Sequence, residues 1–211
     1  MQIYFKIIIV FAAAYLIGSF PSGYVFFRLK TGKDIRNVGL RKNIGATNVF
    51  IEGGPMIGML TVIFDLAKGV IPVIIAKYVF DNVSLSGQLI MITSGIIAIL
   101  GHVFPIYIGF KGGTGLATSI GALIGIIPEI VISFLVLFLV ATPLIKRPAF
   151  FGMMLMVLMP FYALLLGYSR LILGITSVMA IMYIAISLNH IGSMLRGDEY
   201  KEVREKLDML E

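Results

Sequence analysis

Long apolar runs, separated by short polar segments, cover almost the whole chain. Apolar residues fill 3–27, 55–80 and 87–108, and each run is long enough for a helix that crosses the roughly 30 Å hydrocarbon core of a membrane. Two further runs, at 149–166 and 171–188, are shorter but equally apolar. The pattern predicts an all-α integral membrane protein.

The first apolar run contains a break near its end. Segment 18–23 reads Gly-Ser-Phe-Pro-Ser-Gly, and proline and glycine both loosen a helix. Irregular backbone at membrane depth is stable only where protein or a wet cavity supplies hydrogen-bond partners. Two interpretations stay open, a plain kink at a helix end or a broken helix beside a polar site. Because no small-residue cleavage site interrupts the run, we interpret it as a retained helix rather than a signal peptide.

The run at 116–142 is too long for one comfortable span and carries Pro128-Glu129 near its middle. An unpaired charged side chain in hydrocarbon costs about 2.5 kcal/mol or more. We therefore expect two short helices joined by a turn at Pro128-Glu129, which brings the number of transmembrane helices to seven.

The distribution of basic residues supports seven spans. With the N-terminus outside, four segments would face the cytoplasm: 28–52, 109–115, 142–148 and 189–211. They contain 13 of the 17 Lys and Arg residues, as the positive-inside rule requires. A single span over 116–142 would place Lys146 and the basic C-terminal tail on opposite sides. We expect one transmembrane domain over 1–211, with a cytoplasmic C-terminus.

Composition narrows the function classes. The chain is 59% hydrophobic and only 13% charged, with a mean hydropathy of +1.01. It contains no cysteine, which excludes disulfides and thiolate metal sites, and its two histidines argue against a histidine-rich metal site. The net charge of +6 reflects the basic residues of the segments expected on the cytoplasmic side. These loops would face anionic lipid or a phosphate substrate. We therefore expect no nucleic acid as a partner.

The glycine-rich segment Lys111-Gly112-Gly113-Thr114-Gly115 is the first candidate for chemistry. It leads into the helix expected from residue 116, where exposed backbone N–H groups and the helix dipole favour an anion. The Walker pattern of nucleotide-binding loops is absent. A tight interhelical turn is the alternative.

The basic loop at 34–48 is the second candidate. Arg36 suits bidentate phosphate binding, and Asn43, Thr47 and Asn48 add donors between small residues. A solvated loop is the alternative.

Four residues in or near the spans carry further polar chemistry. Asp65 and Lys68 share a helix face and should pair, either as a functional pair or as a structural one. His102 and His190 each lie near a helix end, where either a general base or a hydrogen-bonding residue would fit. The small residues Gly121 and Gly125 predict close helix packing.

These segments occur together in one family. Along nearly its whole length the chain resembles the bacterial acyl-phosphate:glycerol-3-phosphate acyltransferases. The matching stretches are 18–24, 34–36 with Gly39, 45–48, 65–69, 101–105, 110–113, Gly115 and 117–118.

The resemblance implies a seven-helix enzyme of the bacterial cytoplasmic (inner) membrane that needs no cofactor, neither CoA nor a metal. It would transfer an acyl group from acyl phosphate to the 1-hydroxyl of glycerol 3-phosphate, giving lysophosphatidic acid and phosphate. Its partners would be these two substrates and membrane lipid. The expected catalytic residues are Arg36, Lys111, Asn189 and His190. The expected phosphate-binding residues are Ser19, Asn43, Thr47, Asn48, Gly112, Gly113, Thr114 and Gly115.

The chain departs from the family pattern at three places. From Gly39 it reads Gly-Leu-Arg-Lys-Asn where the family has Gly-Ser-Gly-Asn, so the stretch is one residue longer and a functional serine is missing. Thr114 replaces a second lysine, and Ser187 and His190 fall where the family has His and Asn. We expect reduced acyltransferase activity. A non-catalytic binder or transporter of a phosphorylated lipid is the alternative.

Overall fold

A computed structural model describes residues 1–39, 41–80, 84–145, 148–188, 191–198, 201 and 205. Every regular element in these residues is a helix, which confirms the all-α prediction for the described part of the chain. The helices form two compact units, Met1–Pro128 and Glu129–Glu211, which we describe separately.

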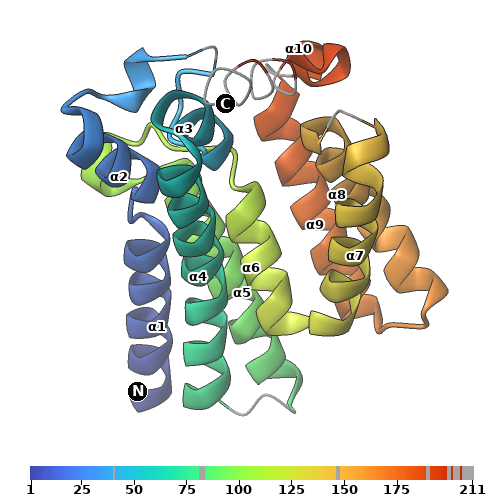
Figure 1. The fold of residues 1–211 in the computed structure, drawn as a ribbon. Coiled ribbons are helices and arrows are strands. Elements are labelled where there is room, and N and C mark those ends of the chain that lie inside the picture. Colours follow the sequence, from blue (N-terminus) through green and yellow to red (C-terminus); the bar gives the residue numbers. More distant parts are fainter. Residues whose placement is uncertain are drawn as a thin grey trace. The chain divides into compact units, whose positions relative to one another are not determined.

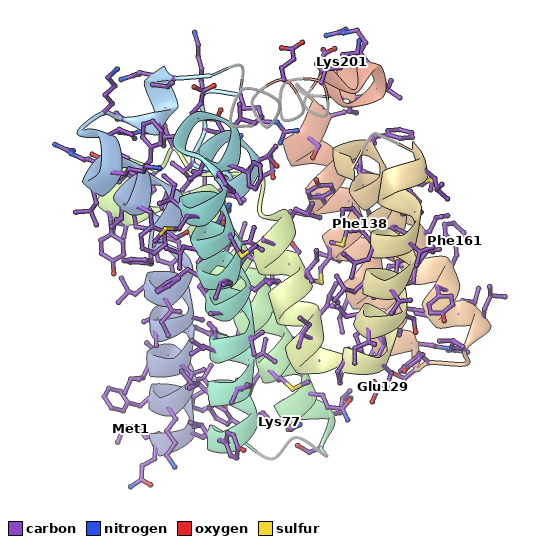
Figure 2. The ribbon with its side chains drawn as sticks, in the orientation of Figure 1. Met1, Lys77, Glu129, Phe138, Phe161 and Lys201 are labelled. Carbon is purple, nitrogen blue, oxygen red and sulfur yellow. The ribbon has the colours of Figure 1, made fainter. Side chains whose placement is uncertain are left out.

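Four helices run side by side in the first unit (Figure 1). They are α1 (Gln2–Gly18), α4 (Pro55–Val79), α5 (Leu85–Val103) and α6 (Leu116–Ile126). Helix α1 packs on α5, and α4 packs on both α5 and α6. Helices α2 (Ser22–Thr31) and α3 (Ala46–Gly53) lie at the end opposite Met1 and Lys77 (Figure 2).

Three described segments are apolar and long enough to cross a membrane: Gln2–Thr31, Pro55–Val79 and Leu85–Ile108. The helices that follow are shorter but apolar. These segments are the runs expected from the sequence, and they define a membrane protein. The number of crossings and their direction stay predictions.

The first apolar run is a broken helix. Helix α1 ends at Gly18, and α2 begins only at Ser22. Polar groups at the break have hydrogen-bond partners within the protein. Lys68 donates to the carbonyl of Phe20, and Ser22 donates to Asp65. The structure therefore favours a break beside a polar site over a plain kink.

Glycines allow the helices of the first unit to cross closely. A Cβ atom on Gly18 would lie 2.2 Å from the carbonyl oxygen of Ala98, at the contact of α1 with α5. On Gly69 it would lie 2.1 Å from the carbonyl oxygen of Thr118, and on Gly121 the same distance from that of Leu66. The packing role expected for Gly121 is confirmed, since small residues let helix backbones approach in this way.

The basic segment 28–52 is more ordered than the expected loop. Helix α2 continues to Thr31, and Gly32 ends it with a left-handed φ of 72°. A short 3-10 helix, η1 (Ile35–Asn37), follows before α3. A small core anchors the segment, formed by Phe27, Ile35, Ile44, Val49 and Ile57.

The second unit contains α7 (Pro128–Ile145), α8 (Pro148–Leu165), α9 (Arg170–Ser187) and α10 (Ile191–Arg196). Helix α6 ends at Ile126 and α7 begins at Pro128, so two helices replace one in the run at 116–142, as expected. Helix α7 meets α8 through two aromatic pairs, Phe134–Tyr162 and Phe138–Phe151. Helix α8 packs on α9. The short α10 occupies part of the expected polar tail.

Candidate functional site

The basic loop after α2 is organised by an ion pair. The carboxylate of Asp34 accepts hydrogen bonds from the backbone N–H of Arg36 (2.9 Å) and from its side-chain Nε (3.0 Å) and Nη2 (2.7 Å). The Arg36 hydrogen bond holds the pKa of Asp34 below its ordinary value, and the same bond raises the pKa of Arg36. The guanidinium is therefore permanently charged and held in one orientation.

Arg36 also joins this loop to the glycine-rich segment. Its Nη1 donates to the carbonyl of Ile108 at 2.7 Å. Ile108 ends the 3-10 helix η2 (Ile106–Ile108), a few residues before Lys111. The guanidinium carbon lies 5.2 Å from the centre of the Tyr24 ring, a cation–π contact. Arg36 therefore links the basic loop to the stretch of chain just before the glycine-rich segment.

Asn48 is buried and holds the shape of the basic loop. Its side-chain Nδ2 donates to the carbonyls of Asn43 (2.9 Å), Val38 (3.2 Å) and Ile35 (3.4 Å). Gly39, with a φ of 77°, packs so closely that a Cβ atom would lie 2.3 Å from the Oδ1 of Asn48. The amide of Asn48 is thus committed to the protein itself.

The neighbouring loop residues have mixed roles. Asn43 accepts a hydrogen bond from the N–H of Gly45 through its side-chain oxygen at 3.0 Å. Lys42, inside the stretch that departs from the family pattern, has a left-handed φ of 46°. Thr47 is half-buried in the first turn of α3. Of the expected phosphate ligands in this loop, Asn43 and Asn48 therefore have a visible structural role.

The glycine-rich segment caps the end of α5. The N–H of Gly112 donates to the carbonyl of Val103 (3.1 Å), and the N–H of Gly113 donates to that of His102 (3.3 Å). A Cβ atom on Gly112 would lie 2.0 Å from the His102 carbonyl oxygen, so this position requires glycine. Lys111 is exposed.

The backbone donors still available lie further along the chain. In the part of the chain that the structure describes, no backbone acceptor serves the N–H groups of Thr114, Gly115 or the first residues of α6. Gly115 precedes this helix with a left-handed φ of 81°. An anion at this end of α6 would meet these N–H groups and the positive end of the helix dipole.

A buried polar cluster lies beneath this segment. The Oδ1 atom of Asp65 accepts a hydrogen bond from Ser22 Oγ (2.5 Å) and pairs with Lys68 Nζ (2.8 Å). His102 Nδ1 lies 3.7 Å from the same oxygen. Lys68 also donates to the carbonyl of Phe20 at 2.9 Å. The expected pairing of Asp65 with Lys68 is confirmed, but Ser22 and the Phe20 carbonyl were not anticipated.

Of the three remaining site candidates, Ser19, Asn189 and His190, the structure describes only Ser19. Ser19 is fully buried at the crossing of α1 with α5, and its hydroxyl has no hydrogen-bond partner among the described residues. Asn189 and His190 lie outside the described residues. No group of acidic or histidine side chains suited to a metal occurs in the described ranges.

The apolar helices define an integral membrane protein, in which the basic loop and the glycine-rich segment are the candidates for binding an anion. Residues 8–197 match the family model described as "Glycerol-3-phosphate acyltransferase". The chain belongs to this family.

Its relatives agree along most of the chain. The glycerol-3-phosphate acyltransferase of Syntrophomonas wolfei is 33% identical over 189 residues, covering 89% of this chain and 92% of the relative. That of Geobacter sulfurreducens is 33% identical and covers 91% and 95%. The crystal structure of PlsY (YgiH), an integral membrane glycerol 3-phosphate acyltransferase, in its glycerol 3-phosphate form has a TM-score of 0.81 at 31% identity, covering 91% of this chain and 93% of PlsY. Its lysophosphatidic acid form has a TM-score of 0.78 at 28% identity, with coverage of 94% and 98%.

Proposed function

We propose that this protein transfers an acyl group from an acyl phosphate to the 1-hydroxyl of glycerol 3-phosphate. The products are lysophosphatidic acid and inorganic phosphate, as in the first step of phospholipid synthesis. Family membership supports the acyl transfer, and the glycerol 3-phosphate and lysophosphatidic acid forms of PlsY support the acceptor and the product. The observation that carries the proposal is the bond from Arg36 to the Ile108 carbonyl, which links the basic loop to the chain three residues before Lys111.

The chemistry requires charge stabilisation more than a strong base. The acceptor hydroxyl attacks the acyl carbon, an ester C–O bond forms, and the bond from the acyl carbon to the phosphate oxygen breaks. The hydroxyl proton passes to a phosphate oxygen, so the leaving group departs as inorganic phosphate. Because phosphate is a good leaving group, fixed cations and N–H donors that hold both phosphates supply most of the catalysis.

The described residues divide this work. Arg36 keeps N–H groups beyond those used by Asp34 and Ile108, and Lys111 adds a second, exposed cation. Thr114 and Gly115 supply backbone N–H groups that have no backbone acceptor among the described residues, whereas Gly112 and Gly113 shape the cradle. The other residues proposed for phosphate binding are Ser19, Asn43, Thr47 and Asn48. The other residues proposed for catalysis are Asn189 and His190.

The membrane arrangement is part of the proposal. The protein crosses a bacterial cytoplasmic (inner) membrane seven times as a single transmembrane domain, with the N-terminus outside and both phosphate loops at the cytoplasmic side. Two observations support it. The basic loops lie at the end of the first unit remote from Met1 (Figure 2), and α6 and α7 are separate helices.

Donor selectivity tests the function. Purified protein in detergent is mixed with labelled glycerol 3-phosphate and either acyl phosphate or acyl-CoA. We expect labelled lysophosphatidic acid from acyl phosphate alone. Product from acyl-CoA would refute the assigned donor. Tight binding of glycerol 3-phosphate without any product would favour the binder or transporter, which the missing serine and Thr114 make a real alternative.

A further inference from the structure

The buried cluster around Asp65 joins three parts of the first unit at one carboxylate oxygen. Ser22 begins α2, Asp65 belongs to α4, and His102 lies in the last turn of α5. Asp65 and His102 are each only 2% exposed, and Lys68 is 3% exposed. None of these side chains is needed as a phosphate ligand in the proposed reaction.

An ion pair at this depth needs a reason other than stability. Taking two charges out of water costs about as much as their attraction returns, so apolar residues would often serve equally well. Asp65 and Lys68 are moreover on one helix, so their attraction alone holds no two elements together. The links between elements are the hydrogen bonds from Ser22 to Asp65 and from Lys68 to the Phe20 carbonyl.

His102 connects this cluster to the glycine-rich segment. Its Nδ1 faces Asp65, and its carbonyl accepts the N–H of Gly113. The opposite edge of the ring lies against Gly113 itself, where a Cβ atom would meet Nε2 at 2.3 Å and Cε1 at 3.0 Å. The imidazole thus lies between the Asp65 carboxylate, which its Nδ1 faces at 3.7 Å without a hydrogen bond, and the Gly113 backbone, against which the opposite edge of the ring packs directly.

We propose that Asp65, Lys68 and His102 are positioning residues, which hold the glycine-rich segment 111–115 where the N–H groups of Thr114 and Gly115 bind the phosphate of glycerol 3-phosphate. The side chains do not touch the substrate. They act through Gly113, whose placement determines where Thr114, Gly115 and the start of α6 present their donors. The inference rests on the proposed function, because it assigns the segment to the acceptor phosphate.

Two substitutions at His102 separate the two edges of its ring. His102→Asn keeps a polar group near Nδ1, facing Asp65, but removes the edge that supports Gly113. His102→Gln reaches the Nε2 position and keeps that support. We expect His102→Asn to raise the KM for glycerol 3-phosphate about tenfold, the effect of one displaced hydrogen bond, with kcat changed less than about threefold. His102→Gln should restore KM to within about threefold of the parent.

A double-mutant cycle tests the contact directly. Gly113→Ala pushes the segment away from the ring in the parent protein, so KM should rise about thirtyfold. In the His102→Asn background the clashing ring edge is gone, and the same substitution should raise KM less than about threefold. Equal effects in both backgrounds would show that the ring does not position the segment.

Matched controls lie in the same helices. Thr61 and Ser94 are buried hydroxyls that donate to the carbonyls of Ile57 and Ile90 in their own helices. Thr61→Val and Ser94→Ala should leave KM unchanged, whereas Asp65→Asn should raise it as His102→Asn does. Gel filtration and thermal unfolding check that each variant is folded.

Failure of this inference differs from failure of the proposed function. If the parent forms lysophosphatidic acid and a folded His102→Asn variant keeps the parental KM, the positioning role is wrong and the function stands. If the parent forms no product, the Kd of glycerol 3-phosphate is measured by calorimetry instead. A weaker Kd for His102→Asn, restored in His102→Gln, then supports the positioning role, and an unchanged Kd refutes it.

Discussion

Replacing Asn48 by alanine should loosen the basic loop that carries Arg36. The Asn48 amide reaches three loop carbonyls and is 2% exposed, so water cannot easily replace it. Two of its bonds, to Asn43 and Val38, are at ordinary length, and the third, at 3.4 Å to Ile35, is weak. At about 1 kcal/mol for each good bond, the loop should lose about 2 kcal/mol of local stability.

Hydrogen exchange measures this loss at defined amides. The N–H of Val38 is bonded to the Ile35 carbonyl in the same loop, so its exchange should accelerate about thirtyfold, the equivalent of 2 kcal/mol. Acyl transfer should weaken at the same time, because Arg36 loses its fixed position. Asn37→Ala, which removes an exposed amide from the same loop, is the matched control and should change neither quantity. Unchanged exchange in Asn48→Ala would refute the reasoning.

Three further predictions follow from the same loops. The pKa of Asp34 lies below its ordinary value of 3.8, so the ion pair stabilises the loop at neutral pH and this stability is lost as pH falls through the lowered pKa. Hydrogen exchange in the loop should therefore accelerate as pH falls through the lowered pKa, and Asp34→Asn should remove this pH dependence. If the pH dependence persists in Asp34→Asn, it arises from another group. Lys111→Ala should weaken use of a phosphate substrate by about 2 kcal/mol, the scale of a charge-assisted contact, and unchanged kcat/KM would remove Lys111 from the site. Because the chain has no cysteine, single cysteines at Glu129 and Lys146 report topology, and labelling of both from one side would exclude seven spans.

Local chemistry explains which parts of the fold were predictable. Proline and glycine loosen a helix, so the sequence marks 18–23 and Pro128 as places where a helix can break. Pro72 and Pro160 nevertheless lie inside continuous helices, so the choice between a kink and a break at 18–23 depends on packing. The apolar run at 55–80 likewise matches α4 closely, because length and hydropathy fix a membrane helix. The run at 87–108 continues beyond α5, which ends at Val103. The ordered structure of 28–52 could not be predicted from the sequence. The residues that anchor it, Ile35, Ile44 and Val49, are single apolar residues that show no helical or strand periodicity.

The site was predictable as a set of segments but not as a set of contacts. The sequence indicates the basic loop and the glycine-rich segment as candidates, and the contact between Arg36 and the Ile108 carbonyl, just before that segment, is visible only in the structure. The use of the Gly112 and Gly113 N–H groups by α5 was not predictable, because it depends on how the chain returns after Pro105. The approach of His102 to Asp65 likewise exists only once α4 and α5 have packed.

The central claim is that this chain catalyses the transfer of an acyl group from acyl phosphate to glycerol 3-phosphate. The most direct measurement follows both products of the purified parent protein in one reaction with acyl phosphate. Lysophosphatidic acid and inorganic phosphate should appear at equal rates, and phosphate release should stop when glycerol 3-phosphate is omitted. Phosphate release that continues without the acceptor, or binding of glycerol 3-phosphate with no lysophosphatidic acid formed, would contradict the account.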